Sequence, residues 1–264
     1  MSAVRVGLVG YGSSGRGIHT PLLAEAGLVV AAVATSAPQR RADAAADHPG
    51  AVVVDDLAAL LRRTDVELVV LASPTGVHVG QARECLDAGI PVVVDKPLGV
   101  DSAEAGALVA HAEAVGSALT VFQNRRWDAE HLTLRRLLEQ GALGEVFRFE
   151  RRWERWRPVP KDRWRENAPP GEGGGLLLDL HSHLVDSATQ LFGPVQRVYA
   201  ELAARTTPAE DDAFVALTHA GGVRSHLGAL SVAGAPGPRT RVLGTGAAYV
   251  VTTFEGEPTA FTSM

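Results

Sequence analysis

In the first half of the chain, short runs of almost continuous Val, Leu and Ala alternate with segments whose apolar residues recur at helical spacing. Such runs are typical of strands that are covered on both faces, as in a parallel sheet. The predicted strands are residues 5–10, 29–35, 68–73, 92–94 and 119–122, and the predicted helices are residues 15–26, 38–46, 77–88 and 103–115. This repetition predicts an α/β domain over residues 1–123, with a Rossmann-like doubly wound parallel sheet.

The pattern changes near Asn124. A helix is predicted at residues 128–140, and residues 146–156 then alternate, with Phe147, Phe149 and Trp153 on one side and charged residues on the other, as in a half-exposed antiparallel strand. After a Gly/Pro-rich loop at 168–175, a helix is predicted at 176–191 and strands at 195–203, 213–219, 223–230, 239–243 and 247–254. Residues 124–264 therefore predict an α+β domain with an open, mainly antiparallel sheet.

Composition narrows the class of protein. The 264 residues are 46% hydrophobic and 21% charged, which matches a globular chain with a large core. A net charge of −5 argues against binding to nucleic acid or to an anionic membrane through bulk charge. With Cys85 as its single cysteine, no signal-peptide pattern and no apolar run of about 20 residues, the chain is expected in the cytoplasm.

The first predicted strand ends in a glycine-rich turn. Gly10, Gly12 and Gly15, with Ser13 and Ser14 between them, form G-x-G-x-x-G at the start of a helix. In that context the glycines permit a tight turn, close approach of a pyrophosphate, and close packing of helix on strand. The motif predicts a dinucleotide site.

The end of the second strand bears on the choice of dinucleotide. NAD sites place an acidic residue there, but this chain has Thr35 and Ser36, followed by Arg40. Hydroxyl and guanidinium groups suit a 2′-phosphate, so NADP is favoured, with NAD as the alternative. Arg40 and Arg41 could instead only solvate a helix face.

Lys96 and Lys161 are the two lysines among 25 basic residues. Lys96 follows the buried run 92–94 in the turn Asp95-Lys96-Pro97, at the sheet edge where ligands bind in this architecture. A partly desolvated lysine can exchange a proton near neutral pH, which predicts a catalytic role. A surface ion pair with Asp95 is the alternative.

Asp179 and His183 are spaced four residues apart on the predicted helix 176–191, and so lie on one face. A carboxylate beside an imidazole can orient it and support its protonated form, which suits proton exchange with an alcohol. A structural contact is an alternative, and a metal pair is poorly supported without a third ligand.

Together these motifs resemble the Gfo/Idh/MocA family of nicotinamide-dependent oxidoreductases along essentially the whole chain. The stretch from Asn124 to Asp128 and the Arg/Trp-rich residues 156–165 are most similar to its branch of NADP-dependent scyllo-inositol dehydrogenases. The resemblance implies that Lys96, Asp179 and His183 are catalytic. It further implies that Ser73, Pro74, Thr75, His78 and Asp95 lie around the cofactor, and Asn124, Arg125, Trp164 and Arg165 near the nicotinamide or substrate.

Two positions depart from the family pattern. His181 stands where the family usually has Gly, which predicts a reshaped pocket or a contact with substrate. The chain ends at Met264, before the terminal strand and helices that family members normally carry, so we expect either a fragment of a longer protein or a shortened second domain.

The expected function is an NADP-dependent dehydrogenase or reductase of a sugar or cyclic polyol that forms a homodimer or higher homo-oligomer. A catalytically inactive dinucleotide-binding sensor is the alternative. Trp153, Trp156 and Trp164 lie among arginines, but interleaved acids favour core packing of the three over binding of nucleic acid.

Overall fold

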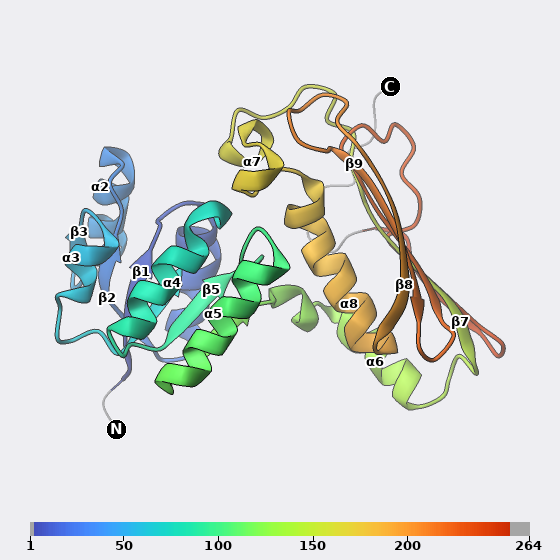
Figure 1. Ribbon diagram of the computed structural model, residues 1–264, viewed down its shortest axis with the longest axis horizontal. Coiled ribbons are helices and arrows are strands. Elements are labelled where there is room, and N and C mark those ends of the chain that lie inside the picture. Colours follow the sequence, from blue (N-terminus) through green and yellow to red (C-terminus); the bar gives the residue numbers. More distant parts are fainter. Residues whose placement is uncertain (1–2, 254–264) are drawn as a thin grey trace. The chain divides into compact units, whose positions relative to one another are not determined.

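A computed structural model of the chain describes residues 3–253. The chain divides into two compact units, Met1–Phe122 and Gln123–Met264 (Figure 1). Within the described residues, no helix is both long and apolar enough to cross a bilayer.

The first unit is built on a six-stranded parallel sheet in the order β3-β2-β1-β4-β5-β6. The strands are β1 (Arg5–Val9), β2 (Val29–Ala34), β3 (Val52–Val54), β4 (Leu68–Leu71), β5 (Val92–Asp95) and β6 (Leu119–Phe122). The strand order reverses direction between β1 and β4. In a doubly wound sheet this is the place where ligands bind, beyond the carboxyl ends of the strands.

Helices connect these strands. They are a π-helical turn (Gly15–His19) that continues into α1 (Thr20–Glu25), then α2 (Pro38–Asp47), α3 (Leu57–Leu61), a 3-10 turn (Thr75–Val77) with α4 (His78–Asp87), and α5 (Ser102–Val115). Alternate residues of the central strands enter separate apolar clusters, with Val69 and Leu71 in one and Val70 in the other. Both faces of the sheet are therefore buried, as the continuous apolar runs predict.

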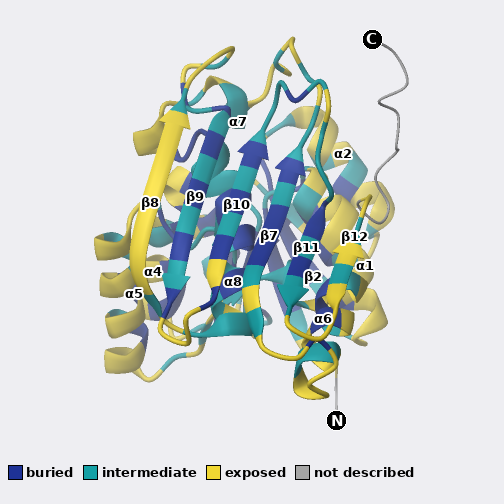
Figure 2. Cartoon of the chain, turned by 90° about the vertical axis from the view of Figure 1, so that its right-hand side faces the viewer, coloured by how far each residue is buried: buried dark blue, intermediate teal, exposed yellow. Residues whose placement is uncertain are grey.

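The second unit contains a six-stranded mixed sheet in the order β12-β11-β7-β10-β9-β8 (Figure 2). The strands are β7 (Val146–Glu154), β8 (Val195–Ala203), β9 (Asp212–His219), β10 (Arg224–Leu230), β11 (Thr240–Gly244) and β12 (Ala248–Val251). Its helical segments are the 3-10 turn Asn124–Trp127, α6 (Ala129–Glu139), α7 (Trp164–Asn167), the 3-10 turn Pro170–Glu172, and the π-helical turn Leu177–His181 that continues into α8 (Ser182–Phe192). The predicted fold class, Rossmann-like sheet and mainly antiparallel second sheet, is confirmed.

The prediction for β7 was wrong in one respect. This strand pairs antiparallel with β11 but parallel with β10, so it lies in the middle of the sheet. Phe149 and Trp153 face the apolar core with Leu184 and Leu227. The predicted strand at 247–254 ends at Val251, and Phe254 and Met264 lie outside the described residues.

The tryptophans do not share one environment. Trp153 is 6% exposed and belongs to the core, whereas Trp156 is 44% exposed and is not part of it. Core packing was therefore the correct prediction for Trp153 and the wrong one for Trp156. The half-exposed Trp164 lies on α7, under an arginine side chain.

Candidate active site

The glycine turn follows β1 as its motif requires. Gly10 has φ +90°, and a Cβ there would lie 2.6 Å from the Ala72 carbonyl oxygen. At Gly15 a Cβ would lie 2.1 Å from the Gly10 carbonyl oxygen. Neither position can carry a side chain without moving the backbone, so these two glycines hold β1 and the following helix close together.

Gly12 is different, because its Cβ position meets a side chain and no backbone. The Arg40 guanidinium carbon lies 3.8 Å from that position, so Arg40 reaches from α2 to the glycine turn. Arg41 turns elsewhere and donates to Asp55 Oδ1 (2.6 Å) and to the Thr35 carbonyl (3.1 Å). Thr35 is buried and Ser36 is exposed. Of the two adjacent arginines, Arg40 is therefore the one placed to meet a phosphate at this turn.

Asp95 ties the glycine turn to the end of β5. Ser14 Oγ donates to Asp95 Oδ2 (2.6 Å), and His19 Nε2 lies 2.7 Å from Asp95 Oδ1. Burial would raise the pKa of the Asp95 carboxyl, but the hydrogen bonds from His19 and Ser14 outweigh burial and lower it. His19, which has no motif context in the sequence, thus supports the site from the first turn of the helix.

His78 supports the next turn in the same way. Its Nδ1 lies 2.8 Å from the Pro97 carbonyl and its Nε2 lies 2.9 Å from the Ser73 carbonyl. The ring is 1% exposed and joins the turn after β4, which contains Ser73, Pro74 and Thr75, to the turn that carries Lys96. These contacts make His78 a support for both turns, and half-buried Lys96 sits beside the cis peptide bond to Pro97.

In the second unit, His183 on α8 is held by a residue that the motifs did not indicate. Its Nδ1 lies 3.2 Å from Gln123 Oε1, while Gln123 Nε2 donates to the Ser182 carbonyl (3.2 Å). A carbonyl can only accept, so this second bond turns the amide oxygen toward the imidazole. His183 Nδ1 is therefore the donor, and Nε2 is the nitrogen suited to take up a proton. The ring also stacks on Trp153, with centroids 6.0 Å apart.

Asp179 lies one helical turn before His183 and receives an arginine. Arg165 Nε is 3.4 Å from Asp179 Oδ1, and the Arg165 guanidinium lies 5.0 Å from the centroid of the Trp164 ring. The short helix α7 therefore brings both of these predicted substrate residues to the helix that carries Asp179.

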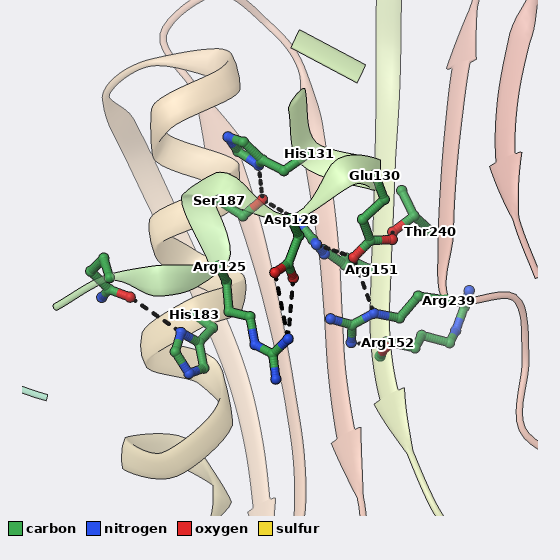
Figure 3. A network of polar contacts seen from close by, with 11 residues as sticks. Arg125, Asp128, Glu130, His131, Arg151, Arg152, His183, Ser187, Arg239 and Thr240 are labelled. Carbon is green, nitrogen blue, oxygen red and sulfur yellow. Dashed lines mark hydrogen bonds and ion pairs between the residues drawn. The ribbon is translucent and has the colours of Figure 1, made fainter. Parts of the chain in front are cut away.

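Arg125 joins a network beneath Trp153, drawn in Figure 3. Arg125 Nη1 lies 3.4 Å from Asp128 Oδ2, and its guanidinium lies 5.1 Å from the centroid of the Trp153 ring. Arg239 packs on the same ring at 4.4 Å and shares the Glu130 carboxylate with Arg151. Asn124, the remaining predicted substrate residue, is half-buried in the 3-10 turn with Arg125.

The arginines of this network repel one another. Burial and the repulsion of Arg151 lower the pKa of Arg239 to about 9, against the attraction of Glu130. Arg239 and the half-buried Arg125 thus pack on the indole of Trp153, which in turn stacks on the His183 ring.

The side chain of His181 is buried. Its ring is 1% exposed and packs toward β10, with Nε2 3.4 Å from the Leu227 carbonyl and Nδ1 without a hydrogen-bond partner among the described residues. The side chain fills space between helix and sheet, so the prediction of a substrate contact was wrong.

The candidate residues thus form one set in each unit. The glycine turn, Thr35, Ser36, Arg40, Asp95, Lys96 and the Ser73–His78 segment belong to the first, and Asn124, Arg125, Trp164, Arg165, Asp179 and His183 to the second. Gln123 and His19 are additions from the structure.

Comparisons with known proteins assign both units to one family of oxidoreductases. Residues 4–123 match the oxidoreductase family with an NAD-binding Rossmann fold, and residues 131–250 match the GFO/IDH/MocA C-terminal domain. The uncharacterized oxidoreductase YdgJ of Escherichia coli is 42% identical over 190 residues, which cover 72% of this chain and 54% of YdgJ. The chain thus matches about half the length of that relative.

Two further relatives have named activities or ligands. The NADP⁺-dependent scyllo-inositol 2-dehydrogenase IolW of Bacillus subtilis is 32% identical over 262 residues, which cover 98% of this chain and 72% of IolW. The WlbA dehydrogenase of Bordetella pertussis, solved with NADH and UDP-GlcNAcA, superposes with a TM-score of 0.82 at 28% identity and covers 92% of this chain and 77% of its own.

Proposed function

Because the chain belongs to the GFO/IDH/MocA family of oxidoreductases, we propose that it is an NADP-dependent dehydrogenase or reductase acting on a secondary alcohol of a sugar or cyclic polyol. The observation that carries the proposal is the His183–Gln123 contact. It orients an imidazole for proton exchange in a chain that also has a complete glycine turn for a dinucleotide.

The residues of the first unit fit a nicotinamide dinucleotide. Gly10 and Gly15 leave no room for side chains, and the helix that starts at Gly15 would direct its backbone N–H groups at the pyrophosphate. When bound, the nicotinamide supplies the hydride acceptor or donor. Arg40 against Gly12, with neutral Thr35 and Ser36 after β2, favours the 2′-phosphate of NADP. The relative IolW is named as an NADP⁺-dependent dehydrogenase, which supports the choice of NADP.

The residues of the second unit fit proton transfer. In the oxidative direction, His183 Nε2 takes the proton of the substrate hydroxyl while Nδ1 donates to Gln123 Oε1. The Asp179 carboxylate, one turn earlier, stabilises the positive charge that the imidazole then carries. Lys96 shares the proton of the substrate hydroxyl, as predicted from the sequence.

Turnover measured at about 340 nm, where reduced nicotinamide absorbs, tests this function. The full chain is assayed with NADP⁺ and with NAD⁺ on scyllo-inositol, myo-inositol and a set of aldoses. We expect oxidation of at least one polyol or sugar, with the higher kcat/KM for NADP⁺.

Variants separate catalysis from cofactor binding. His183→Ala and Lys96→Met should lower kcat by roughly 10²–10⁴-fold, the usual contribution of a general acid or base, with little change in Kd for NADP⁺. Arg136→Ala, an exposed arginine on α6, is the control and should behave as the wild type. Tight cofactor binding without turnover of any substrate would favour the dinucleotide-binding sensor instead.

A further inference from the structure

A cavity within the second unit is lined by more basic than acidic groups. Its walls come from the segment that follows β7, from the start of the π-helical turn before α8, and from the ends of the loops beside β9 and β10. The charged side chains in its lining are Arg155, Arg157, Lys161, Arg163, Glu166 and Asp179. Four cationic groups therefore face two carboxylates.

Both carboxylates already have arginine partners. Glu166 accepts from Arg163, with Nε to Oε2 at 3.0 Å, and Asp179 lies 3.4 Å from Arg165 Nε. Arg157 and Lys161 differ, because no carboxylate of the described residues lies within ion-pair distance of either side chain. Arg157 is half-buried and Lys161 is exposed at the rim. The positive charge of the cavity is thus not neutralised by its own lining.

The cavity also borders the proposed catalytic helix. Asp179, one turn before His183, is part of its wall, and so is Trp153, whose ring stacks on that of His183. Arg155 lies over the same indole, 5.1 Å from the ring centroid. A ligand in the cavity would therefore contact the residues that hold the proposed base.

We propose that this cavity is a subsite for a negatively charged substituent of the substrate, a carboxylate or a phosphate, held by Arg157 and Lys161. This inference rests on the proposed function and narrows its substrate class to acidic or phosphorylated sugars and polyols. A guanidinium can bind either anion through two parallel N–H groups, and an ammonium adds a mobile point charge. A neutral polyol would give these two cations no counterpart.

Binding of charged and neutral ligand pairs tests the subsite. The full chain, saturated with NADP⁺, is titrated calorimetrically with D-glucose, D-glucuronate and D-glucose 6-phosphate. We expect at least one charged ligand to bind about tenfold or more tightly than glucose, in line with the worth of one charge-assisted hydrogen bond, and this advantage to shrink in high salt. The two charged ligands distinguish a carboxylate site from a phosphate site.

The variants Arg157→Ala and Lys161→Ala should each reduce the advantage of the charged ligand about tenfold and leave the affinity for glucose unchanged. Arg157→Lys should retain part of it, and Arg136→Ala is the control for loss of an arginine outside the cavity. Equal affinity for charged and neutral ligands, no binding of either charged ligand, or an advantage that survives in both alanine variants would overturn the subsite.

The outcome is separable from that of the proposed function. If neutral polyols are oxidised and the charged ligands have no advantage, the enzyme stands and the subsite fails. If a charged sugar binds through Arg157 and Lys161 but no substrate turns over, the subsite stands and the dehydrogenase fails.

Discussion

Gln123 and His183 are separated by 60 residues in the sequence, yet the Gln123 side chain determines which nitrogen of the His183 imidazole carries the proton. We predict that Gln123→Leu lowers kcat about tenfold or more, because the ring then loses the acceptor for Nδ1. Gln123→Glu should restore part of the rate, since a carboxylate oxygen accepts from Nδ1 but cannot donate to the Ser182 carbonyl. Steady-state kinetics of both variants would check this, and an unchanged kcat for Gln123→Leu would rule out the positioning role.

Arg40 offers a second test at the level of one side chain. Arg40→Ala should weaken NADP⁺ binding by about tenfold or more while Kd for NAD⁺ stays nearly constant, because only NADP⁺ carries the 2′-phosphate. Fluorescence titration gives both constants. Arg83→Ala, an exposed arginine on α4, serves as the control. Equal losses for both cofactors would contradict the assignment of Arg40.

His181 makes the stability depend on pH. Burial lowers its pKa below the usual value of about 6.5, so the unfolded chain binds a proton in mild acid that the folded chain does not. The free energy of unfolding should therefore fall as the pH drops below about 6.5, by at most about 1.4 kcal/mol per pH unit from this residue. Burial also lowers the pKa values of His131 and His226.

Urea unfolding at pH 7.5 and pH 5.5 measures this dependence. In His181→Leu the loss of stability on acidification should be smaller than in the wild type. An identical loss in wild type and His181→Leu would show that the His181 ring is not the source.

At the scale of elements, the contact between His19 and Asp95 couples the helix after the glycine turn to the end of β5. His19→Leu should weaken cofactor binding and lower the free energy of unfolding by about 1–3 kcal/mol, because a buried carboxylate loses a donor. His19→Gln keeps an N–H donor and should lie closer to the wild type. Calorimetric melting and NADP⁺ titration provide the two readouts, and full stability in His19→Leu would argue against the tie.

The sequence was most informative where one periodicity extends over a whole element. Helix α5, helix α8 together with the π-helical turn before it, and the buried strands β4 and β5 lie within a few residues of their predicted positions. Asp101 caps α5 by accepting from the backbone N–H groups of Ala103 and Glu104. Strand β3 and helix α3 have three and five residues, too few for a period to show, and they were not predicted.

The pairing of strands was harder to predict than the positions of the helices and strands. Alternation along β7 indicates which side chains share a face, but it does not indicate which strands lie on either side, so the parallel neighbour β10 was missed. The same limit applies to the prediction of the candidate site. The glycines and the predicted catalytic residues stand in local motifs, whereas Gln123, His19 and the network of Glu130 with Arg239 depend on contacts between distant segments.

At the scale of the molecule, the edge strand β8 carries exposed apolar residues. Val198 is 66% and Leu202 49% exposed, although their partners across the pair, Leu217 and Ala213, are buried (Figure 2). Helix α8 packs against β7 and β10, and most of β8 is exposed. We propose that a second copy of the chain covers this strand, since an open edge with apolar side chains favours association.

Light scattering after size exclusion tests this proposal. The wild type should elute with at least twice the chain mass of 27.7 kDa, and Val198→Lys with Leu202→Lys should shift it toward one chain. Val115→Lys, at an exposed apolar residue on α5, is the control. A monomeric wild type at tens of micromolar would exclude the β8 interface.

The central place of β7 also determines when the second sheet can form. This strand is synthesised early, but its partners β10 and β11 begin at Arg224 and Thr240, so most of the unit must leave the ribosome before β7 is paired. Sheets built from such distant segments fold slowly and expose apolar surface while incomplete. In residues 1–122, by contrast, each strand can pair with an earlier one as it emerges. During translation the first unit should therefore fold before Phe149 and Trp153 are buried in the core of the second unit.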